Sequence, residues 1–212
     1  MIQWVYERAQ KSTHLQNLII ATDDKRIYDI CQKFGADVRM TSSHHVSGTE
    51  RVAEVAETLS SPYIINIQGD EPLVRAEMID ALISAMVDEE TPVATLAIKV
   101  ADLSLIEDPN IVKVVTDKQS NALYFSRSPL PFQSSDYFYQ HIGIYGYRRD
   151  FLLDMRRWPP SRLEKEEKLE QLRVLENGYR VKVVFTHIST LSVDTPQDII
   201  MVENFMKKEQ YD

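Results

Sequence analysis

The stretch Tyr-Ile-Ile-Asn-Ile-Gln-Gly-Asp-Glu-Pro, residues 63–72, decides the fold class of this chain. Its first half is β-branched and apolar, which is typical of a buried strand. Its second half turns polar at Asp70 and Glu71. In open α/β sheets ligands bind beyond the carboxyl ends of strands, so acidic residues there are well placed to hold a metal ion. A turn that starts the next helix is the commoner explanation, and both interpretations stay open.

Short β-branched runs alternate with helical patterns on both sides of this stretch. The predicted strands are 17–21, 63–68, 93–98, 111–115, 122–125, 141–147 and 181–186. Apolar residues at helical spacing predict helices at 1–10, 27–34, 49–59, 78–87 and 162–176. This rhythm predicts an α/β fold, with a mostly parallel mixed sheet and helices on both faces, in a single domain over 1–212.

The section from 93 to 147 has strands with little helix between them. This pattern predicts a mixed-strand section beside the main sheet. We expect it to carry substrate contacts and a subunit interface.

Composition limits the class of protein. The chain has 212 residues, 43% of them hydrophobic and 26% charged, which suits one soluble globular domain. Its net charge of -8, without a basic cluster, argues against nucleic acid as a partner. No apolar run approaches the roughly 20 residues needed to span a bilayer, so no membrane partner is expected. The single cysteine, Cys31, excludes a disulfide within the chain, and a cytoplasmic location is expected.

A second acidic residue, Asp194, ends a short apolar segment. The residues after it predict a helix start, with Thr195 as N-cap, Pro196 as first helical residue and Asp198 closing a capping box. Capping therefore explains Asp198 but not Asp194. If Asp70 and Asp194 converge, their oxygens would suit Mg²⁺, which accepts phosphate and water as its remaining ligands.

The segment 40–51 is rich in small polar residues and enters a helix. Its hydroxyl and amide groups could read the edge of a base, and the helix N-terminus favours anions. A polar loop capped by Ser47 or Thr49 is the commoner arrangement for such a segment. His44 and His45 lack the spacing of a helical zinc site.

Aromatic residues gather in 124–127 and 141–147. Alternation along a strand places His141, Gly143, Tyr145 and Tyr147 on one face, where ring edges and a close backbone approach suit a sugar. Ordinary aromatic packing between strands would give the same pattern.

Together, these segments resemble the family of 3-deoxy-manno-octulosonate (Kdo) cytidylyltransferases. The resemblance spans nearly the whole chain and rests on seven strings in the family's order: ATDD at 21–24, SGTER at 47–51, NIQGDEP at 66–72, ALYFSR at 122–127, HIGIYGY at 141–147, LEQLRVLENG at 169–178 and VDTPQD at 193–198. The related CMP-sialate synthetases would not be expected to share the strings at 141 and 169 in this form.

The resemblance implies a Rossmann-like fold of the nucleotide-diphospho-sugar-transferase type and a homodimer. It implies an enzyme whose substrates are CTP and Kdo, and whose products are CMP-Kdo, for lipopolysaccharide biosynthesis, and pyrophosphate. The anomeric hydroxyl would attack the α-phosphate in line, without a covalent enzyme intermediate. The alternatives are a cytidylyltransferase for a related acid, such as sialate or 8-amino-Kdo, and a catalytically impaired homologue.

The resemblance also implies roles for individual residues. Asp70 and Asp194 would hold the cofactor Mg²⁺, and Arg127 would complete the catalytic set. The cytidine site would be lined by Met40, Thr41, His45, Ser47, Gly48, Thr49 and Gln68. The sugar would be surrounded by Arg127, His141, Tyr145, Glu170 and Gln171.

The family's opening segment has no counterpart in this sequence. Its members begin with a strand and a basic, glycine-containing loop that holds the triphosphate, and Met1 falls just after that loop. The resemblance therefore implies an N-terminally truncated chain. We expect this chain to turn over CTP poorly, because a central strand and the phosphate grip would be missing.

Overall fold

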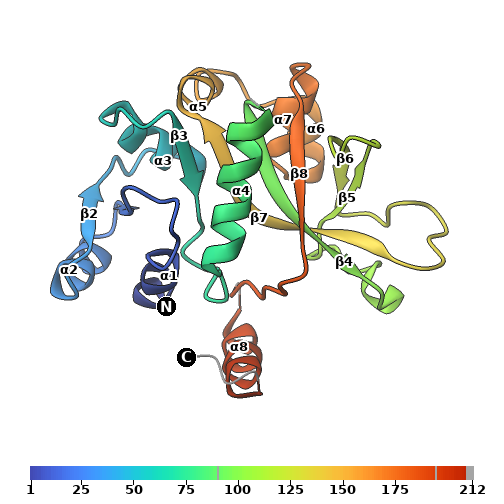
Figure 1. Cartoon of the computed structure of the whole chain (residues 1–212), viewed down its shortest axis with the longest axis horizontal. Helices are drawn as coiled ribbons and strands as arrows, with labels where there is room; N and C mark the ends of the chain where they lie inside the picture. The colour runs from blue at the N-terminus through green and yellow to red at the C-terminus, as the bar shows by residue number, and fades with distance from the viewer. Residues whose placement is uncertain (90, 194, 209–212) are drawn as a thin grey trace. The chain divides into compact units, whose positions relative to one another are not determined.

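The structure is a computed structural model that describes residues 1–89, 91–193 and 195–208. The chain divides into two compact units, and Figure 1 labels their helices and strands. Unit 1 comprises residues 1–55, 67–80 and 188–212, and unit 2 comprises residues 56–66 and 81–187. No helix within the described residues is long and apolar enough to cross a membrane.

Unit 1 contains a small parallel sheet and several helices. Strands β1 (Ile19–Thr22) and β2 (Asp37–Met40) pair in parallel, with Ile19 opposite Asp37. The helices of this unit include α1 (Ile2–Ala9), α2 (Lys25–Lys33), most of α3 (Gly48–Glu57) and α8 (Pro196–Lys208). Strand β2 was not predicted.

Helix α8 begins as the sequence predicts. The Thr195 amide donates to Asp198 Oδ2 at 2.7 Å, and the Thr195 hydroxyl donates to the same oxygen at 2.9 Å. These bonds satisfy groups that a helix N-terminus leaves unpaired. The predicted capping role of Asp198 is therefore confirmed.

Unit 2 is built on a six-stranded sheet in the order β6-β5-β7-β4-β8, with β3 also paired to β7. Its strands are β3 (Tyr63–Asn66), β4 (Val93–Val100), β5 (Lys113–Thr116), β6 (Ala122–Ser126), β7 (Phe138–Arg148) and β8 (Val181–Thr186). The 11-residue strand β7 pairs antiparallel with β3, β4 and β5.

The predicted α/β fold with a mixed sheet is confirmed, but its mostly parallel character is not. Among the described strands only β1 with β2 and β4 with β8 pair in parallel, while four pairs are antiparallel. The reason is β7, which runs opposite to each of its three neighbours. The section 93–147, predicted to hold mixed strands, supplies most of these pairs.

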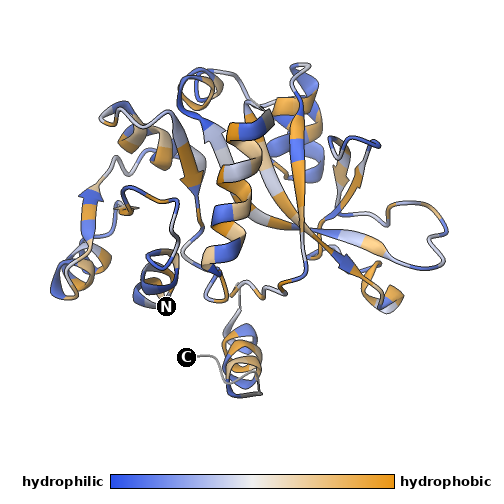
Figure 2. Cartoon of the chain, viewed as in Figure 1, coloured by the Kyte–Doolittle hydropathy of each residue, from blue (hydrophilic) through white to orange (hydrophobic). Residues whose placement is uncertain are grey.

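The sheet of unit 2 buries a continuous apolar layer, and its strands are largely hydrophobic in Figure 2. Phe125 and Ile144 are fully buried in it. Gly146 on β7 lies so close to its neighbours that a Cβ atom would collide with the Met86 sulfur and crowd Ile65 at 3.2 Å. The glycine therefore allows α4 (Ala76–Glu89) and β3 to approach β7 closely.

The charged region 162–176 forms two short helices rather than the predicted single one. Helix α6 (Arg162–Glu167) ends at Lys168, which adopts the left-handed conformation with φ 55° and ψ 46°. Helix α7 (Gln171–Glu176) follows. A third helix, α5 (Arg149–Met155), directly follows β7. The left-handed residue redirects the chain, so Glu167 and Gln171 are not positioned by one continuous helix.

Candidate active site

In unit 1, side chains of α3 fix the loop between β2 and α3. The Ser42 amide donates to Glu54 Oε2 at 3.1 Å, and the same oxygen contacts His45 Nε2. His45 Nδ1 lies 3.6 Å from Glu50 Oε2. Ser47 caps the helix, because its hydroxyl accepts from the Glu50 amide at 3.2 Å. The polar loop is therefore an ordered structure.

Arg51 joins this loop to the turn after β1. Its Nη1 donates to Thr41 Oγ1 at 2.6 Å and to the Ser42 carbonyl at 3.3 Å. Its Nη2 donates to Asp23 Oδ2 at 2.9 Å. One guanidinium thus connects the chain segments that follow the two parallel strands.

Gly48 brings the start of α3 against the segment after β3. A Cβ atom at Gly48 would lie 3.0 Å from Oε1 and 3.2 Å from Nε2 of Gln68. This approach places the Gln68 amide beside the N-terminus of a ten-residue helix. Backbone N–H groups and a side-chain amide in this arrangement can bind an anion and read the edge of a base.

The residues predicted to bind cytidine all lie in unit 1. The structure places Thr41, His45 and Ser47 in the ordered loop, and Gln68 against Gly48. Thr49 is buried in α3, and Met40 is 45% exposed at the end of β2. Their contacts with a nucleotide stay a prediction.

The two acidic segments meet in unit 1. The Val193 amide donates to the Asp70 carbonyl at 2.9 Å. Asp70 is half-buried, whereas Asp194 lies outside the described residues. Among the described residues, no three His, Cys, Asp or Glu side chains gather as a metal site. The adjoining segments and the oxygen donor of Asp70 fit Mg²⁺, which needs few protein ligands when phosphate is present.

In unit 2, an aromatic row lies along β7. Ring centroids are 5.1 Å apart for Phe125 and His141, 5.4 Å for His141 and Tyr145, and 5.8 Å for Tyr145 and Tyr147. The prediction that His141, Tyr145 and Tyr147 share one face is therefore confirmed. Burial, followed by the proximity of Tyr147 and Glu170, raises the pKa of the Tyr145 phenol.

Thr95 on β4 fixes the form of His141. The fully buried Thr95 hydroxyl donates to the Ile144 carbonyl at 2.9 Å and lies 3.0 Å from His141 Nε2. Because its proton goes to a carbonyl, Thr95 can only accept from Nε2–H. Burial lowers the pKa of His141 to about 3, so the ring is neutral. Its Nδ1 is then a hydrogen-bond acceptor.

Glu167, the last residue of α6, holds Arg127. Its Oε2 accepts from the Arg127 amide at 2.9 Å, and its Oε1 accepts from Ser126 Oγ at 2.8 Å. The Arg127 side chain donates through Nε to the Glu167 carbonyl at 3.0 Å and through Nη1 to the Pro109 carbonyl at 2.8 Å. Within the described residues Nη2 makes no hydrogen bond, so this donor can serve an anionic ligand.

Glu170 and Gln171 stand at the junction of α6 and α7. Arg173, whose side chain is 6% exposed, pairs with Glu164 at 2.7 Å and with Glu170 at 3.2 Å. Gln171 is 5% exposed, and its Nε2 has no hydrogen-bond partner in the described part of the chain. An unpaired buried amide costs about 1–3 kcal/mol, which a ligand acceptor would recover. The five predicted sugar residues thus all lie in unit 2.

Several organising residues were not predicted. Arg51, Glu54, Thr95, Lys113 and Glu167 touch predicted site residues or their backbone. Lys113 carries the only local signal, since it is a charged residue inside an apolar strand sequence.

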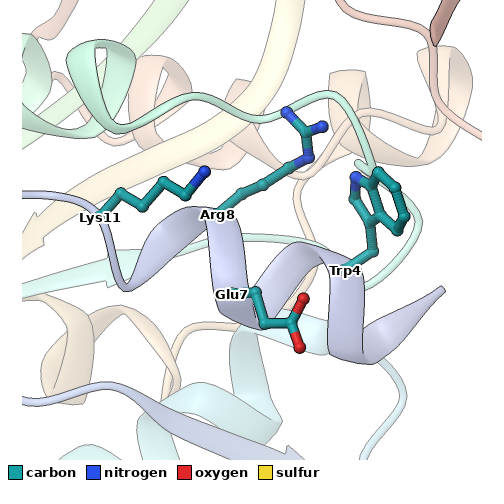
Figure 3. Close-up of a pocket in the computed structure, with 4 residues that line it drawn as sticks. All are labelled: Trp4, Glu7, Arg8 and Lys11. Atoms are coloured by element: carbon teal, nitrogen blue, oxygen red, sulfur yellow. The ribbon is translucent and has the colours of Figure 1, made fainter. Parts of the chain in front are cut away.

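A shallow pocket also lies on α1 in unit 1. Its lining residues are Trp4, Glu7, Arg8 and Lys11, and Figure 3 shows the Arg8 guanidinium beside the Trp4 ring. The guanidinium carbon is 5.1 Å from the ring centroid, which is a cation–π contact. None of the predicted site residues lines this pocket.

Known proteins resemble this chain over nearly its full length. The sequence model of a family described as cytidylyltransferase matches residues 1–187. The 3-deoxy-manno-octulosonate cytidylyltransferase of Solibacter usitatus is 50% identical over 98% of this chain and 84% of its own length. The protein of the same name from Fusobacterium nucleatum is 47% identical over 98% of this chain and 86% of its own.

Solved structures agree with the sequence relatives. CMP:2-keto-3-deoxy-manno-octonic acid synthetase complexed with CTP superposes with a TM-score of 0.93 and 38% identity, covering 98% of this chain and 88% of that one. HddC from Yersinia pseudotuberculosis, at 12% identity and a TM-score of 0.69, covers 96% of this chain and 84% of its own and shares the fold alone. The chain therefore belongs to the cytidylyltransferase family, among the 3-deoxy-manno-octulosonate cytidylyltransferases.

Proposed function

We propose that this chain transfers CMP from CTP to Kdo and releases pyrophosphate. The observation that carries the proposal is the 50% identity to a Kdo cytidylyltransferase, and it is supported by the position of all five predicted sugar residues in unit 2, where the His141 and Tyr145 rings lie 5.4 Å apart. A free guanidinium donor, a neutral imidazole acceptor and an unpaired buried amide suit an acidic, polyhydroxylated sugar. The product would enter lipopolysaccharide biosynthesis in the cytoplasm.

For the nucleotide, we propose the cluster around Gly48 and Gln68. The Gln68 amide can both donate to and accept from a base edge, which suits cytosine. The N-terminus of α3 offers backbone N–H groups to a phosphate. Met40, Thr41, His45, Ser47 and Thr49 would shape the rest of the site.

We propose that Asp70 and Asp194 hold Mg²⁺. The hydrogen bond between Val193 and the Asp70 carbonyl supports this role, because it joins the segments that carry both residues. When bound, Mg²⁺ neutralises charge on the phosphates. The chain's own task is to hold the nucleotide with its α-phosphate presented to the sugar.

For the sugar, we propose that Arg127 Nη2 binds the carboxylate of Kdo. His141 Nδ1 would accept a hydrogen bond from a sugar hydroxyl, and Gln171 Nε2 would donate one. Glu170 and Tyr145 would complete the pocket. Held in this way, the anomeric hydroxyl attacks the α-phosphate in line and pyrophosphate leaves, so positioning supplies much of the acceleration.

We propose that two copies of the chain form a homodimer through an aromatic surface of unit 2. Tyr139 lies 4.4 Å from Phe185 and 5.3 Å from Tyr137 between ring centroids. Tyr137 and Phe185 are 36% and 39% exposed, and the Lys99 ammonium lies 4.0 Å from the Tyr137 ring. Light scattering on the F185E variant should show a monomer if this surface is the interface.

The direct test is pyrophosphate release from CTP and Mg²⁺ with Kdo, sialate or 8-amino-Kdo as acceptor. The proposal expects Kdo to be the best acceptor. Calorimetry with CTP and Mg²⁺ would separate a nucleotide binder without turnover from an inactive chain. Release that is no faster with Kdo than without any acceptor would refute the proposed activity.

A further inference from the structure

Lys113 is a charged residue in the second strand from one edge of the unit 2 sheet. It lies on β5, opposite Ser126 on β6 and Gln140 on β7, and is fully buried. Lysine is among the residues least often buried, because desolvating its ammonium is costly. Its presence there calls for a specific set of partners.

Those partners are three main-chain carbonyls. Lys113 Nζ donates to the carbonyls of Asp108 at 3.0 Å, of Ile111 at 2.7 Å and of Arg127. An ammonium has three N–H donors and no acceptor, so this set uses its whole hydrogen-bonding capacity. Burial lowers the pKa of Lys113, while the nearby carboxylates of Asp108, Glu107 and Glu167 oppose that shift. No donor is left for a ligand.

The three carbonyls share one neighbour, Arg127. Two of them bracket Pro109, whose own carbonyl accepts from Arg127 Nη1 at 2.8 Å. The third is the Arg127 carbonyl itself. One ammonium therefore fixes both the main chain of Arg127 and the segment that receives its side chain.

Glu167 supplies the opposite side of this arrangement. It accepts from the Arg127 amide through its carboxylate and from Arg127 Nε through its carbonyl. Between Lys113 and Glu167, the backbone, Nε and Nη1 of Arg127 are all held, and Nη2 is left. A long side chain fixed in advance loses less conformational entropy when it binds a ligand.

We propose that Lys113 is a positioning residue for the reaction: it holds Arg127 so that Nη2 meets the carboxylate of the acidic sugar. This inference rests on the proposed function for the role of Arg127. Lys113 itself touches no substrate, and it acts through the guanidinium.

The test compares K113M and K113Q with wild-type protein. Methionine keeps the length and loses every donor, whereas glutamine keeps two N–H donors. We expect the KM for Kdo to rise about tenfold or more in K113M, because all three hydrogen bonds of the ammonium are lost, and to rise less in K113Q. The KM for CTP should stay within about twofold, because the nucleotide cluster makes no use of these bonds.

Two controls separate positioning from general damage. Val114 is the buried neighbour of Lys113, and V114A should lower stability while leaving the KM for Kdo unchanged. In an R127A background K113M should add no further loss, because a residue that acts through Arg127 has nothing left to position.

Three results would overturn the inference: an unchanged KM for Kdo in folded K113M, equal rises in both KM values, or additive losses in K113M with R127A. If K113M does not fold, K113Q decides in the same way. If wild-type protein releases no pyrophosphate with Kdo, the proposed function fails. The positioning of Arg127 by Lys113 can then still be tested by NMR, without any activity measurement. Positioning requires that the Arg127 Nη1–H protons, which donate to the Pro109 carbonyl in the segment that Lys113 fixes, exchange more slowly in the wild type than in K113Q, and equal exchange would refute it.

Discussion

The nucleotide cluster of unit 1 and the sugar cluster of unit 2 use similar polar residues in different surroundings. In unit 1 the side chains of Arg51 and Asp23 are 18% and 36% exposed. In unit 2 the side chains of Arg173 and Glu164 are 6% and 13% exposed, and Lys113 is fully buried. Water can replace a lost partner in the first cluster but not in the second. Equivalent mutations should therefore cost more stability in unit 2 than in unit 1.

The largest effect expected is on stability, from R173A. Removing this guanidinium takes the buried cation away from Glu164, whose side chain is 13% exposed, so the free energy of unfolding should fall by about 3–5 kcal/mol. Urea unfolding measures the loss. R162A is the matched control, because its ion pair with Glu166 is exposed and should be worth less than about 0.5 kcal/mol. Equal losses of stability in R173A and R162A would show that burial does not decide the strength of these ion pairs.

The next effect is on turnover, from D70N. The substitution removes a proposed Mg²⁺ ligand, and pyrophosphate release should fall by about 100-fold, which corresponds to about 2.7 kcal/mol. The melting temperature should hardly change, because Asp70 is only half-buried. D37N, at an exposed position on β2, serves as control. Full activity in D70N would refute the proposed role of Asp70 as a Mg²⁺ ligand.

R51A should act on the nucleotide alone. Losing the bonds to Thr41, Ser42 and Asp23 loosens the loop, and the KM for CTP should rise about tenfold, as one charged hydrogen bond of about 1.4 kcal/mol would give. The KM for Kdo should not change. R26A removes an exposed arginine of unit 1 and should leave both constants as they are. A parallel rise in both KM values would show that the clusters are not separate.

His141 should give the smallest effect, seen in the pH dependence of stability. Its folded pKa of about 3 lies below the ordinary value of 6.5, so between these values only the unfolded chain takes up the proton. Stability should therefore fall as pH drops from 6.5 toward 3, by less than about 1.4 kcal/mol per pH unit because the residue keeps partial exposure. In H141Q that part of the slope should be absent. Identical slopes in acid urea titrations would contradict it.

Local signals were enough to predict much of the fold. Strand β8 has the predicted bounds, and the Thr195 cap follows from its sequence pattern alone. Strand β2 was missed because Asp37–Met40 is short, half polar and without alternation. The break at Lys168 was missed because lysine, unlike glycine, gives no signal for a left-handed residue.

The candidate site shows the same limit. Residues that carry a recognisable string, such as His141 and Gln68, were predicted from the sequence, and their contacts with ligands stay a prediction. Glu167 was not, because in a run of charged helical residues it looks like part of a solvated face, and its partner Arg127 is 40 residues away. The antiparallel pairing of β3 with β7 was missed for a similar reason, since the two strands meet across more than 70 residues.

Strand β7 has a further consequence, for the order in which the chain is made. The pairing of β1 with β2 involves only residues 19–40, so it can form as soon as residue 40 has left the ribosome. Strands β3 and β4 must wait for β7, which is complete only at Arg148, whereas β5 can first pair with β6, and β4 gains β8 at residue 186. During translation two apolar strands would thus remain without their common neighbour, and the need for chaperones should be greatest in that interval.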